Sequence, residues 1–447
     1  MKIKSILLLM ASPVFSFAQQ NIKLITLDPG HFHAALIQKS MYPQVDPTVH
    51  VYAEASRDLD LHMERITGYN KRTAEPTAWK QQVYTGKDFF QKMIDEKKGN
   101  VVVLAGNNRL KTDYILTSVG KGFNVFADKP MAIDTKGFEK LKKAFAVAQK
   151  SNVQLYDIMT ERYEITTMLQ RAFSMQPELF GTLEKGSPED PSVTKISVHH
   201  FYKYVSGSVL TRPSWFFDAS QQGAGIVDVT THLVDLIQWE CFPEQVIDYK
   251  KNIKILNTRS WTTPVSVSEF TTVTKEPVPD YFKPITDAAG NIQVNCNGEF
   301  TYAINGVHAK VSVVWNYKAP EGTGDTHYSL MRGSNASLII RQGKEENFKP
   351  TLYIEPRSAS ANIEPTLNAA LAEVSKTFPG ITAVKIDKGW VIKVPEKYND
   401  GHEAHFAQVT KKYLDYLQNK NMPAWEIPNM IAKYYTTTKA KEMAEKQ

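Results

Sequence analysis

The stretch "NVFADKPMAID", residues 124–134, decides the fold, because in it an apolar strand runs directly into a helix start. The strand ends at Asp128, and Lys129 follows immediately before Pro130. A residue before proline is sterically excluded from the α-helical region, so we expect Lys129 to be held extended at the strand tip. Its ammonium group would then reach a ligand from a fixed origin. A solvated surface lysine beside a helix-starting proline is the alternative.

The alternation of apolar strand and amphipathic helix extends over the first third of the chain. Segments that predict buried strands, separated by segments that predict helices, lie at 22–28, 49–54, 100–106, 123–128 and 153–159. This spacing is typical of a doubly wound parallel sheet of the Rossmann type. We therefore expect a dinucleotide-binding domain over residues 19–157, with its ligand outside the carboxyl ends of the strands.

After about residue 160 the pattern changes to longer apolar segments, many with period-two alternation. These segments lie at 193–205, 259–274, 297–318 and 336–343. One apolar face and one polar face per strand is typical of an open, mainly antiparallel sheet. We expect a C-terminal α+β domain over residues 158–447. It would contain this sheet, an added module at about 345–400 and a polar-faced helical segment at 402–435.

The composition of the 447-residue chain excludes some classes of protein. With 42% hydrophobic and 22% charged residues, the chain is typical of a globular protein with two or three domains. The net charge of +6 is distributed without a basic run, so we do not expect nucleic-acid binding. Cys241 and Cys296 could form a disulfide in an oxidising compartment or remain unpaired.

The first eighteen residues have the pattern of a secretory signal. Lys2 and Lys4 precede a short apolar run, and the run closes on small residues at Ser16 and Ala18. We expect cleavage after Ala18 and export, with the periplasm as the expected compartment. The apolar run is too short to span a bilayer, so we expect no membrane anchor.

The predicted strands of the first domain end in residues suited to a polar ligand. Asp28 and His33 replace the first and third glycines of a dinucleotide fingerprint, so Gly30 alone would let the backbone approach a diphosphate. The expected cofactor-binding residues are Gly30, His31, Phe32, Glu54, Ser56, Arg57, Gly106, Asn107, Asp128 and Lys129.

The residues after the second strand leave the choice of dinucleotide open. Glu54 or Asp58 would accept hydrogen bonds from the ribose hydroxyls of NAD, whereas Ser56 and Arg57 would suit the 2′-phosphate of NADP. We expect NAD, with NADP as the alternative, and we expect no metal site.

A second group of candidate residues lies in "QQGAGIVDVTTHLVDLIQWE", residues 221–240. Two glycines open a predicted helix on which Asp228, His232 and Asp235 share one face. His232 interrupts an apolar run, and an imidazole four residues from a carboxylate can transfer a proton at neutral pH. A polar face turned to water is the alternative.

Together these motifs resemble those of the Gfo/Idh/MocA oxidoreductases, named for glucose-fructose oxidoreductase, inositol dehydrogenase and rhizopine catabolism. The resemblance covers roughly residues 22–345. "FADKPMAI" is similar to the E-K-P strand end of the family, with Asp128 in the position of its Glu. "GAGIVDVTTHLVDL" is similar to its glycine-rich turn and D-x-x-x-H, and "TERY" to its Arg-aromatic segment. "LAGNN" stands where the family usually has T-P-N.

The resemblance implies roles for individual residues. Lys129 would contact the nicotinamide ribose and the substrate hydroxyl, His232 would be the acid/base, and Asp228 would bind or orient the substrate. The second domain of the family is an open sheet that often forms subunit contacts, so we expect a homo-oligomer. The other expected wall residues of the substrate site are Arg162, Tyr163, Tyr202, Trp215 and Phe216.

Three functions are compatible with these motifs. The first is NAD(P)-dependent oxidation of a carbohydrate or polyol hydroxyl by an exported enzyme. The second is glycosidic cleavage by oxidation and elimination with a tightly bound NAD, because NAD-dependent glycosidases are a known exception to the two-carboxylate mechanism. The third is a non-catalytic sugar-binding protein on the same scaffold, which the degraded glycine fingerprint favours.

Overall fold

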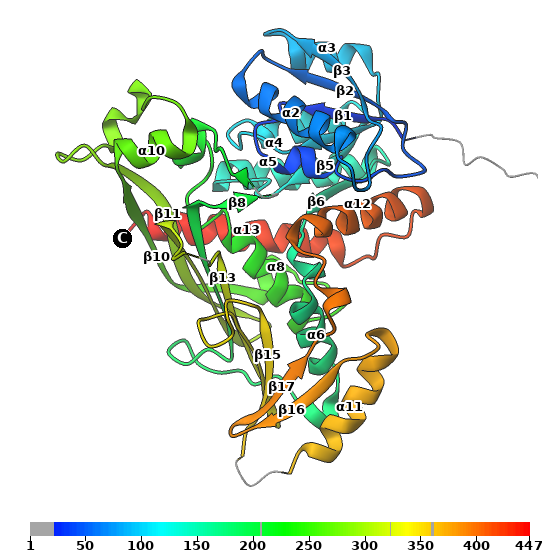
Figure 1. Ribbon diagram of the computed structural model, residues 1–447, viewed down its shortest axis with the longest axis vertical. Coiled ribbons are helices and arrows are strands. Elements are labelled where there is room, and N and C mark those ends of the chain that lie inside the picture. The colour runs from blue at the N-terminus through cyan, green and yellow to red at the C-terminus, as the bar shows by residue number, and fades with distance from the viewer. Residues whose placement is uncertain (1–21, 206–207, 322, 359–361) are drawn as a thin grey trace, which may run out of the picture.

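The computed structural model describes residues 22–205, 208–321, 323–358 and 362–447, which form two adjoining α/β units (Figure 1). The expected signal sequence lies outside the described residues. Within these four ranges, no helix is both long enough and apolar enough to cross a membrane.

The first unit is built on a six-stranded parallel sheet with the order β3-β2-β1-β4-β5-β6. Its strands are β1 (Leu24–Leu27), β2 (Thr48–Ala53), β3 (Lys80–Thr85), β4 (Val101–Leu104), β5 (Asn124–Asp128) and β6 (Leu155–Ile158). Its helices are α1 (His33–Leu36), α2 (Arg57–Lys71), α3 (Phe89–Glu96), α4 (Lys111–Gly120) and α5 (Thr135–Lys150). This order confirms the predicted doubly wound fold. It also places a ligand crevice at the carboxyl ends of β1 and β4, where the strand order reverses.

Two elements of this unit differ from the prediction. The sequence "HAALIQKSM" predicts a helix over 33–41, but helix α1 ends at Leu36, so the loop after β1 leads into a single turn of helix. Strand β3 was not predicted, because its sequence KQQVYT is mostly polar. It lies at the sheet edge and is largely exposed, which removes the apolar signal that identifies a buried strand.

The second unit is built on a nine-stranded sheet with the order β10-β11-β12-β7-β13-β14-β15-β17-β16. The pairing is antiparallel except between β12 and β7, which confirms the predicted open, mainly antiparallel sheet. The strands are β7 (Val193–Tyr202), β10 (Ile253–Val265), β11 (Ile292–Ile304), β12 (Val307–Lys318), β13 (Thr326–Arg332), β14 (Ala336–Arg341), β15 (Thr351–Pro356), β16 (Thr382–Ile386) and β17 (Gly389–Lys393). A separate small hairpin consists of β8 (Tyr204–Val205) and β9 (Ser208–Val209).

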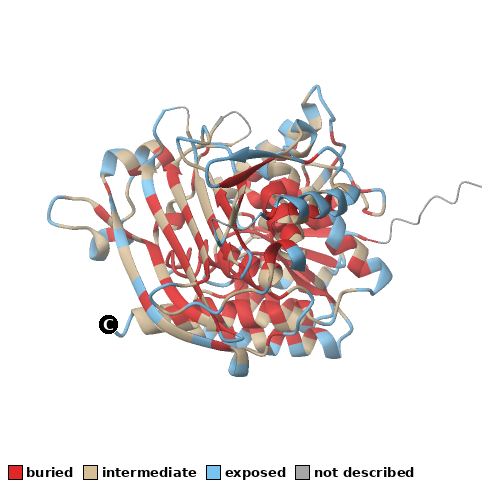
Figure 2. Cartoon of the chain, turned by 90° about the horizontal axis from the view of Figure 1, so that it is seen from below, coloured by how far each residue is buried: buried red, intermediate tan, exposed pale blue. Residues whose placement is uncertain are grey.

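Helices cover one face of this sheet, and buried residues alternate with more exposed ones along its strands (Figure 2). The helices of the second unit are α6 (Ile165–Ser174), α7 (Pro177–Phe180), α8 (Thr230–Cys241), α9 (Tyr249–Asn252), α10 (Val267–Thr274), α11 (Glu364–Thr377) and α13 (Glu426–Ala444). Helix α12 (His402–Asn419) packs instead against β6 and α1 of the first unit. The segment 351–396 has the predicted order of strand, helix, strand and strand. Cys241 and Cys296 are both free, so they do not pair.

The strand expected over 259–274 is correct only in its first half. Strand β10 ends at Val265, and helix α10 follows directly. The Ser266 hydroxyl accepts a hydrogen bond from the backbone N–H of Glu269, whose carboxylate accepts one from the Ser266 N–H. This capping box satisfies the free N–H groups of a helix start. The S-x-x-E spacing was therefore a helix signal within an apparent strand.

Of the two C-terminal helices, α12 packs on the core of the first unit, and α13 contributes to the cores of both units. The Tyr413 ring of α12 stacks on Phe126 of β5, with ring centroids 4.4 Å apart. Helix α13 runs between the two units (Figure 1), and it is buried on nearly all sides, so the expected polar face is wrong. Its Lys433 is completely buried, and the ammonium lies 2.6 Å from Asp157 of β6 and 2.7 Å from Asp235 of α8.

We expect Lys433→Met to lower the free energy of unfolding by about 3–5 kcal/mol, because it leaves the buried carboxylate of Asp157 without its cation and removes one of the two cations at Asp235. Equilibrium unfolding in urea measures this change. Lys446→Met removes an exposed pair with Glu442 and should change the value by less than about 0.5 kcal/mol. If the two variants are equally stable, the Lys433 ammonium does not help α13 to hold the two units together.

Candidate active site

The carboxyl end of β5 and the loop before α8 meet at a buried ion pair. The Lys129–Pro130 peptide bond is cis, and the Lys129 ammonium lies 2.6 Å from Oδ1 of Asp228. The other carboxylate oxygen of Asp228 accepts a hydrogen bond of 3.0 Å from the side-chain amide of Gln222. Burial opposes ionisation of Asp228, but the Lys129 charge and its hydrogen bond outweigh burial and hold the pKa of Asp228 below its usual value.

The loop before α8 is fixed by close packing. Helix α8 begins only at Thr230, so Asp228 precedes the helix and His232 lies in its first turn, unlike the predicted shared helix face. A Cβ on Gly225 would lie 1.7 Å from the carbonyl oxygen of Cys296, so only glycine lets this loop lie against β11.

His232 is buried close to the ion pair. Burial, and then the charge of Lys129, lower the pKa of His232 to about 3, so its imidazole is neutral at neutral pH. Among the described residues, no hydrogen-bond partner meets its Nδ1 atom. A neutral buried imidazole beside an ammonium group can accept a proton from a ligand that enters between them.

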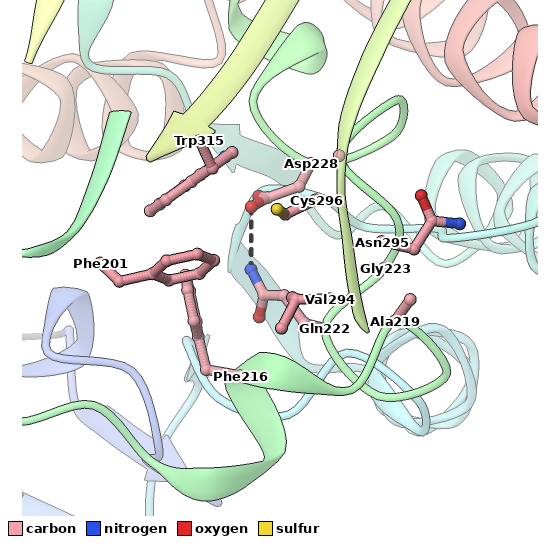
Figure 3. A pocket seen from close by; sticks show the side chains of 11 residues that line it. Phe201, Phe216, Ala219, Gln222, Gly223, Asp228, Val294, Asn295, Cys296 and Trp315 are labelled. Atoms are coloured by element: carbon pink, nitrogen blue, oxygen red, sulfur yellow. Dashed lines mark hydrogen bonds between the residues drawn. The ribbon is translucent and has the colours of Figure 1, made fainter. Parts of the chain in front are cut away.

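A pocket opens over Asp228. Its polar wall includes the carboxylate of Asp228 and the amide of Gln222, and the rings of Phe201, Phe216 and Trp315 form the opposite wall (Figure 3). The remaining lining residues are Ala219, Gly223, Gly225, Val294, Asn295 and Cys296. A mainly apolar pocket with a few convergent polar groups is typical of a site for a small molecule.

Four of the expected wall residues lie elsewhere. The Arg162 guanidinium binds both carboxylate oxygens of Asp235 and also contacts Glu426, so it belongs to the ion-pair network under α13. Tyr163 is part of the core of the first unit. Tyr202 follows the inward-facing Phe201 on β7, and alternation turns its ring to the opposite face of the sheet.

Trp215 is the fourth of these residues, and it lies in the dinucleotide cleft. Its indole N–H donates a hydrogen bond of 2.7 Å to Asp58 at the start of α2. A Cβ on Gly30 would lie 3.1 Å from both the indole ring and the Asp58 carboxylate. The surface of Gly30 where a diphosphate would approach is therefore covered by a side chain of the second unit.

Other contacts between the units hold the cleft in this closed arrangement. Arg57 donates to the carbonyl oxygen of Thr274 at 2.9 Å, and Asn107 donates to the side chain of Gln221 at 2.8 Å. Ser56 caps helix α2 by accepting from the Leu59 N–H. Ser56 and Arg57 are thus engaged by protein groups, whereas Glu54 is exposed at the end of β2.

The residues around the loop nevertheless fit a dinucleotide. Asp28 has a φ of +48°, the left-handed conformation that usually requires glycine at this turn. A narrow pocket beside Gly30, His31 and Phe32 also contains Arg65 and Arg212. Arg65 donates to the carbonyl oxygen of Leu61 and is partly exposed, so it can bind an anion. Arg212 is buried, and its guanidinium donates to the carbonyl oxygens of His200 and Phe201. The residue types suit a diphosphate, and Trp215 must move to admit one.

A cluster of histidines near the site was not predicted from the sequence. His33 shares a 2.9 Å hydrogen bond with Asp128, and the His402 ring lies 6.3 Å from the His33 ring. His402 also pairs with Glu161 at 3.3 Å. The signals were the His-x-His spacing after β1 and the His-x-x-His spacing at 402–405, which only the fold brings together.

Two family models match the chain. The one described as "Oxidoreductase family, NAD-binding Rossmann fold" matches residues 47–157, and the one described as "Putative oxidoreductase C terminal domain" matches residues 169–445. Comparison with the curated proteins finds no match.

Solved structures give the same result. The chain is 52% identical to a "putative oxidoreductase" from Parabacteroides merdae ATCC 43184, with a TM-score of 0.94 over 97% of this chain and 99% of that one. Levoglucosan dehydrogenase in complex with NADH and levoglucosan is 13% identical, with a TM-score of 0.59 over 95% and 98%. A 3-ketoreductase from Actinomadura kijaniata in complex with NADP and TDP-benzene is 12% identical, with a TM-score of 0.54 over 92% and 94%. The last two show the fold alone.

The turn after β1 predicts a pH-dependent stability. Burial, and then the charge of Glu54, raise the pKa of Asp28 to about 6. Because this folded-state pKa exceeds the unfolded value, folding favours the protonated acid, and stability falls as the pH rises to about 6 and above. We expect Asp28→Asn to raise the free energy of unfolding by about 1–3 kcal/mol at pH 8 and by little near pH 4.

Urea denaturation at both pH values measures this difference. Asparagine tolerates the positive φ of this position, so the substitution removes the charge without straining the turn. Asp95→Asn on the exposed face of α3 is the matched control and should change stability by less than about 0.5 kcal/mol at either pH. A gain for Asp28→Asn that is the same at both pH values would contradict the assignment.

Proposed function

Because the chain belongs to the Gfo/Idh/MocA oxidoreductase family, whose Rossmann domain binds NAD, we propose that it oxidises a hydroxyl group of a carbohydrate or polyol. The observation that carries the proposal is the buried pair of Lys129 and Asp228. It lies where the carboxyl end of β5 meets an aromatic-walled pocket, next to a neutral His232. An ammonium, a carboxylate and an imidazole there suit proton transfer to and from an alcohol.

Each residue of the site would have its own role toward the substrate. Asp228 and Gln222 accept and donate hydrogen bonds at the pocket floor and orient the sugar hydroxyls. The Lys129 ammonium donates a hydrogen bond to the reacting oxygen and stabilises its negative charge. His232 would accept the hydroxyl proton at Nδ1, for which the described residues provide no hydrogen-bond partner. A bound nicotinamide supplies the acceptor for the hydride that leaves the same carbon.

The cofactor would be held along the carboxyl ends of β1, β2 and β5. Gly30 and Phe32 would contact the diphosphate, with Arg65 as its cationic partner. Glu54 would accept the adenosine ribose hydroxyls, which favours NAD over NADP. Phe201, Phe216 and Trp315 exclude water from the opposite side of the substrate.

A second candidate function is a non-catalytic sugar-binding protein, and the closed cleft favours it. Trp215 covers Gly30, and three carboxylates, those of Asp28, Glu54 and Asp58, lie near this part of the cleft. Titration of the purified protein with NADH separates the two functions. Saturable binding supports the oxidoreductase, whereas no binding of NADH or NADPH supports the sugar-binding protein.

The proposal includes export and self-association. Export rests on the signal-like residues 1–18. Self-association rests on the face of the large sheet that the helices leave open, where Tyr202 is only partly buried. Analytical ultracentrifugation of the mature protein tests the second point, and a monomer at micromolar concentration would contradict it.

We expect Lys129→Ala and His232→Ala each to lower turnover about 100-fold or more, because each removes a group that acts on the hydroxyl proton. Reduction of NAD by a panel of hexoses, polyols and aryl glycosides measures turnover, and release of the aryl group reports glycosidic cleavage separately. NADH binding by His232→Ala should match wild type, so that a lost rate reflects proton transfer.

His308→Ala is the control, because this histidine lies at the far end of the β11–β12 hairpin and contacts only backbone oxygens. It should keep the wild-type rate. Wild-type rates in both Lys129→Ala and His232→Ala would refute the assignment of these two residues.

A further inference from the structure

A compact group of two histidines and one aspartate lies beside the candidate site, and the proposed proton transfer does not use it. His31 and His33 follow β1, and Asp128 ends β5. One ligand atom from each of these residues lies within 4.8 Å of the other two. Their side chains are only 14%, 9% and 5% exposed. The sequence led us to expect no metal site, and this group revises that expectation.

The distances match a metal coordination sphere. Zn²⁺ binds nitrogen and carboxylate oxygen at about 2.0–2.2 Å, so neighbouring ligand atoms of a tetrahedral site lie about 3.3 Å apart. Oδ2 of Asp128 lies 2.9 Å from Nδ1 of His33 and 3.7 Å from Nδ1 of His31. The first distance is shorter than the value for a tetrahedral site, and the second is longer. At 3.7 Å, no hydrogen bond holds His31 against the carboxylate.

The carboxylate of Asp128 is not engaged by the nearby lysines. The Lys129 ammonium is directed to Asp228 at 2.6 Å. The Lys111 ammonium donates to the backbone carbonyl of Asp128 at 3.1 Å. The backbone N–H of His33 meets Nδ1 of His31 only at 3.4 Å, a long contact that a metal ion would replace. Among the described residues, none of the three ligand atoms therefore has a strong hydrogen-bond partner outside this group.

We propose that His31, His33 and Asp128 bind one divalent first-row transition ion, with Zn²⁺ as the expected occupant. Two imidazoles and one carboxylate form a ligand set that suits zinc and iron better than magnesium or calcium. Three protein ligands leave one coordination position for water or for a ligand from the cleft. The alternative is a structural hydrogen bond between His33 and Asp128, in which His31 has no part.

His31→Ala separates the two interpretations. This substitution keeps the hydrogen bond between His33 and Asp128, but it removes one of the three ligands. The full-length protein, dialysed first against a chelator, is titrated with ZnCl₂ by calorimetry and with CoCl₂ by visible absorption. We expect one Zn²⁺ per chain and d–d bands from bound Co²⁺. His31→Ala and Asp128→Asn should each weaken Zn²⁺ binding at least about tenfold.

His308→Ala is the control for surface histidines and should bind Zn²⁺ as the wild type does. Thermal unfolding in the presence of chelator should be the same for His31→Ala and wild type, which shows that the variant is folded. The proposal is wrong if the wild type binds no stoichiometric Zn²⁺. It is equally wrong if His31→Ala binds Zn²⁺ with wild-type affinity, because the ion would then lie at other histidines.

Discussion

The contact between Lys129 and Asp228 is the constraint around which the two units are arranged. Each charge is buried, so each would be costly without the other. Lys129 belongs to the first unit and Asp228 to the second, and Gln222 holds the free oxygen of the same carboxylate. The carbonyl of Gln222 in turn accepts a hydrogen bond from Asn108 of the first unit. These connected polar contacts thus fix the two units relative to one another at the point where a substrate would react.

The segment that builds the substrate pocket also closes the dinucleotide cleft. Phe216 and Gln222 line the pocket, and the neighbouring Trp215 lies on Gly30 and bonds to Asp58. These residues belong to one short stretch, so a movement of its backbone that takes Trp215 out of the cleft also shifts the pocket wall. Interiors that are packed this closely transmit displacement. The entry of a dinucleotide into the cleft is therefore coupled to the shape of the pocket that Phe216 and Gln222 line.

Local patterns predicted the fold and singled out Lys129 and Asp228, but their ion pair and the walls of the site depended on tertiary packing. The buried strand that ends at Lys129 was visible, because apolar runs and a pre-proline residue are local features. Arg162 and Tyr202 were wrongly placed as wall residues, because their surroundings depend on distant elements. Arg162 meets Glu426 of the last helix, and Tyr202 faces away because Phe201 faces in. His402 was missed for the same reason, since α12 returns to the first unit from the far end of the chain.

The charges of the site explain how an anion and a cation could occupy neighbouring positions. Arg65 lies beside Gly30 in the narrow pocket and is partly exposed, which favours a diphosphate there. On the other side of the loop, Asp128 lies between two imidazoles, which favours a divalent ion. His31 lines both positions. Opposite charges bound so close together attract one another, so occupation of one position should strengthen binding at the other unless His31 must move between them.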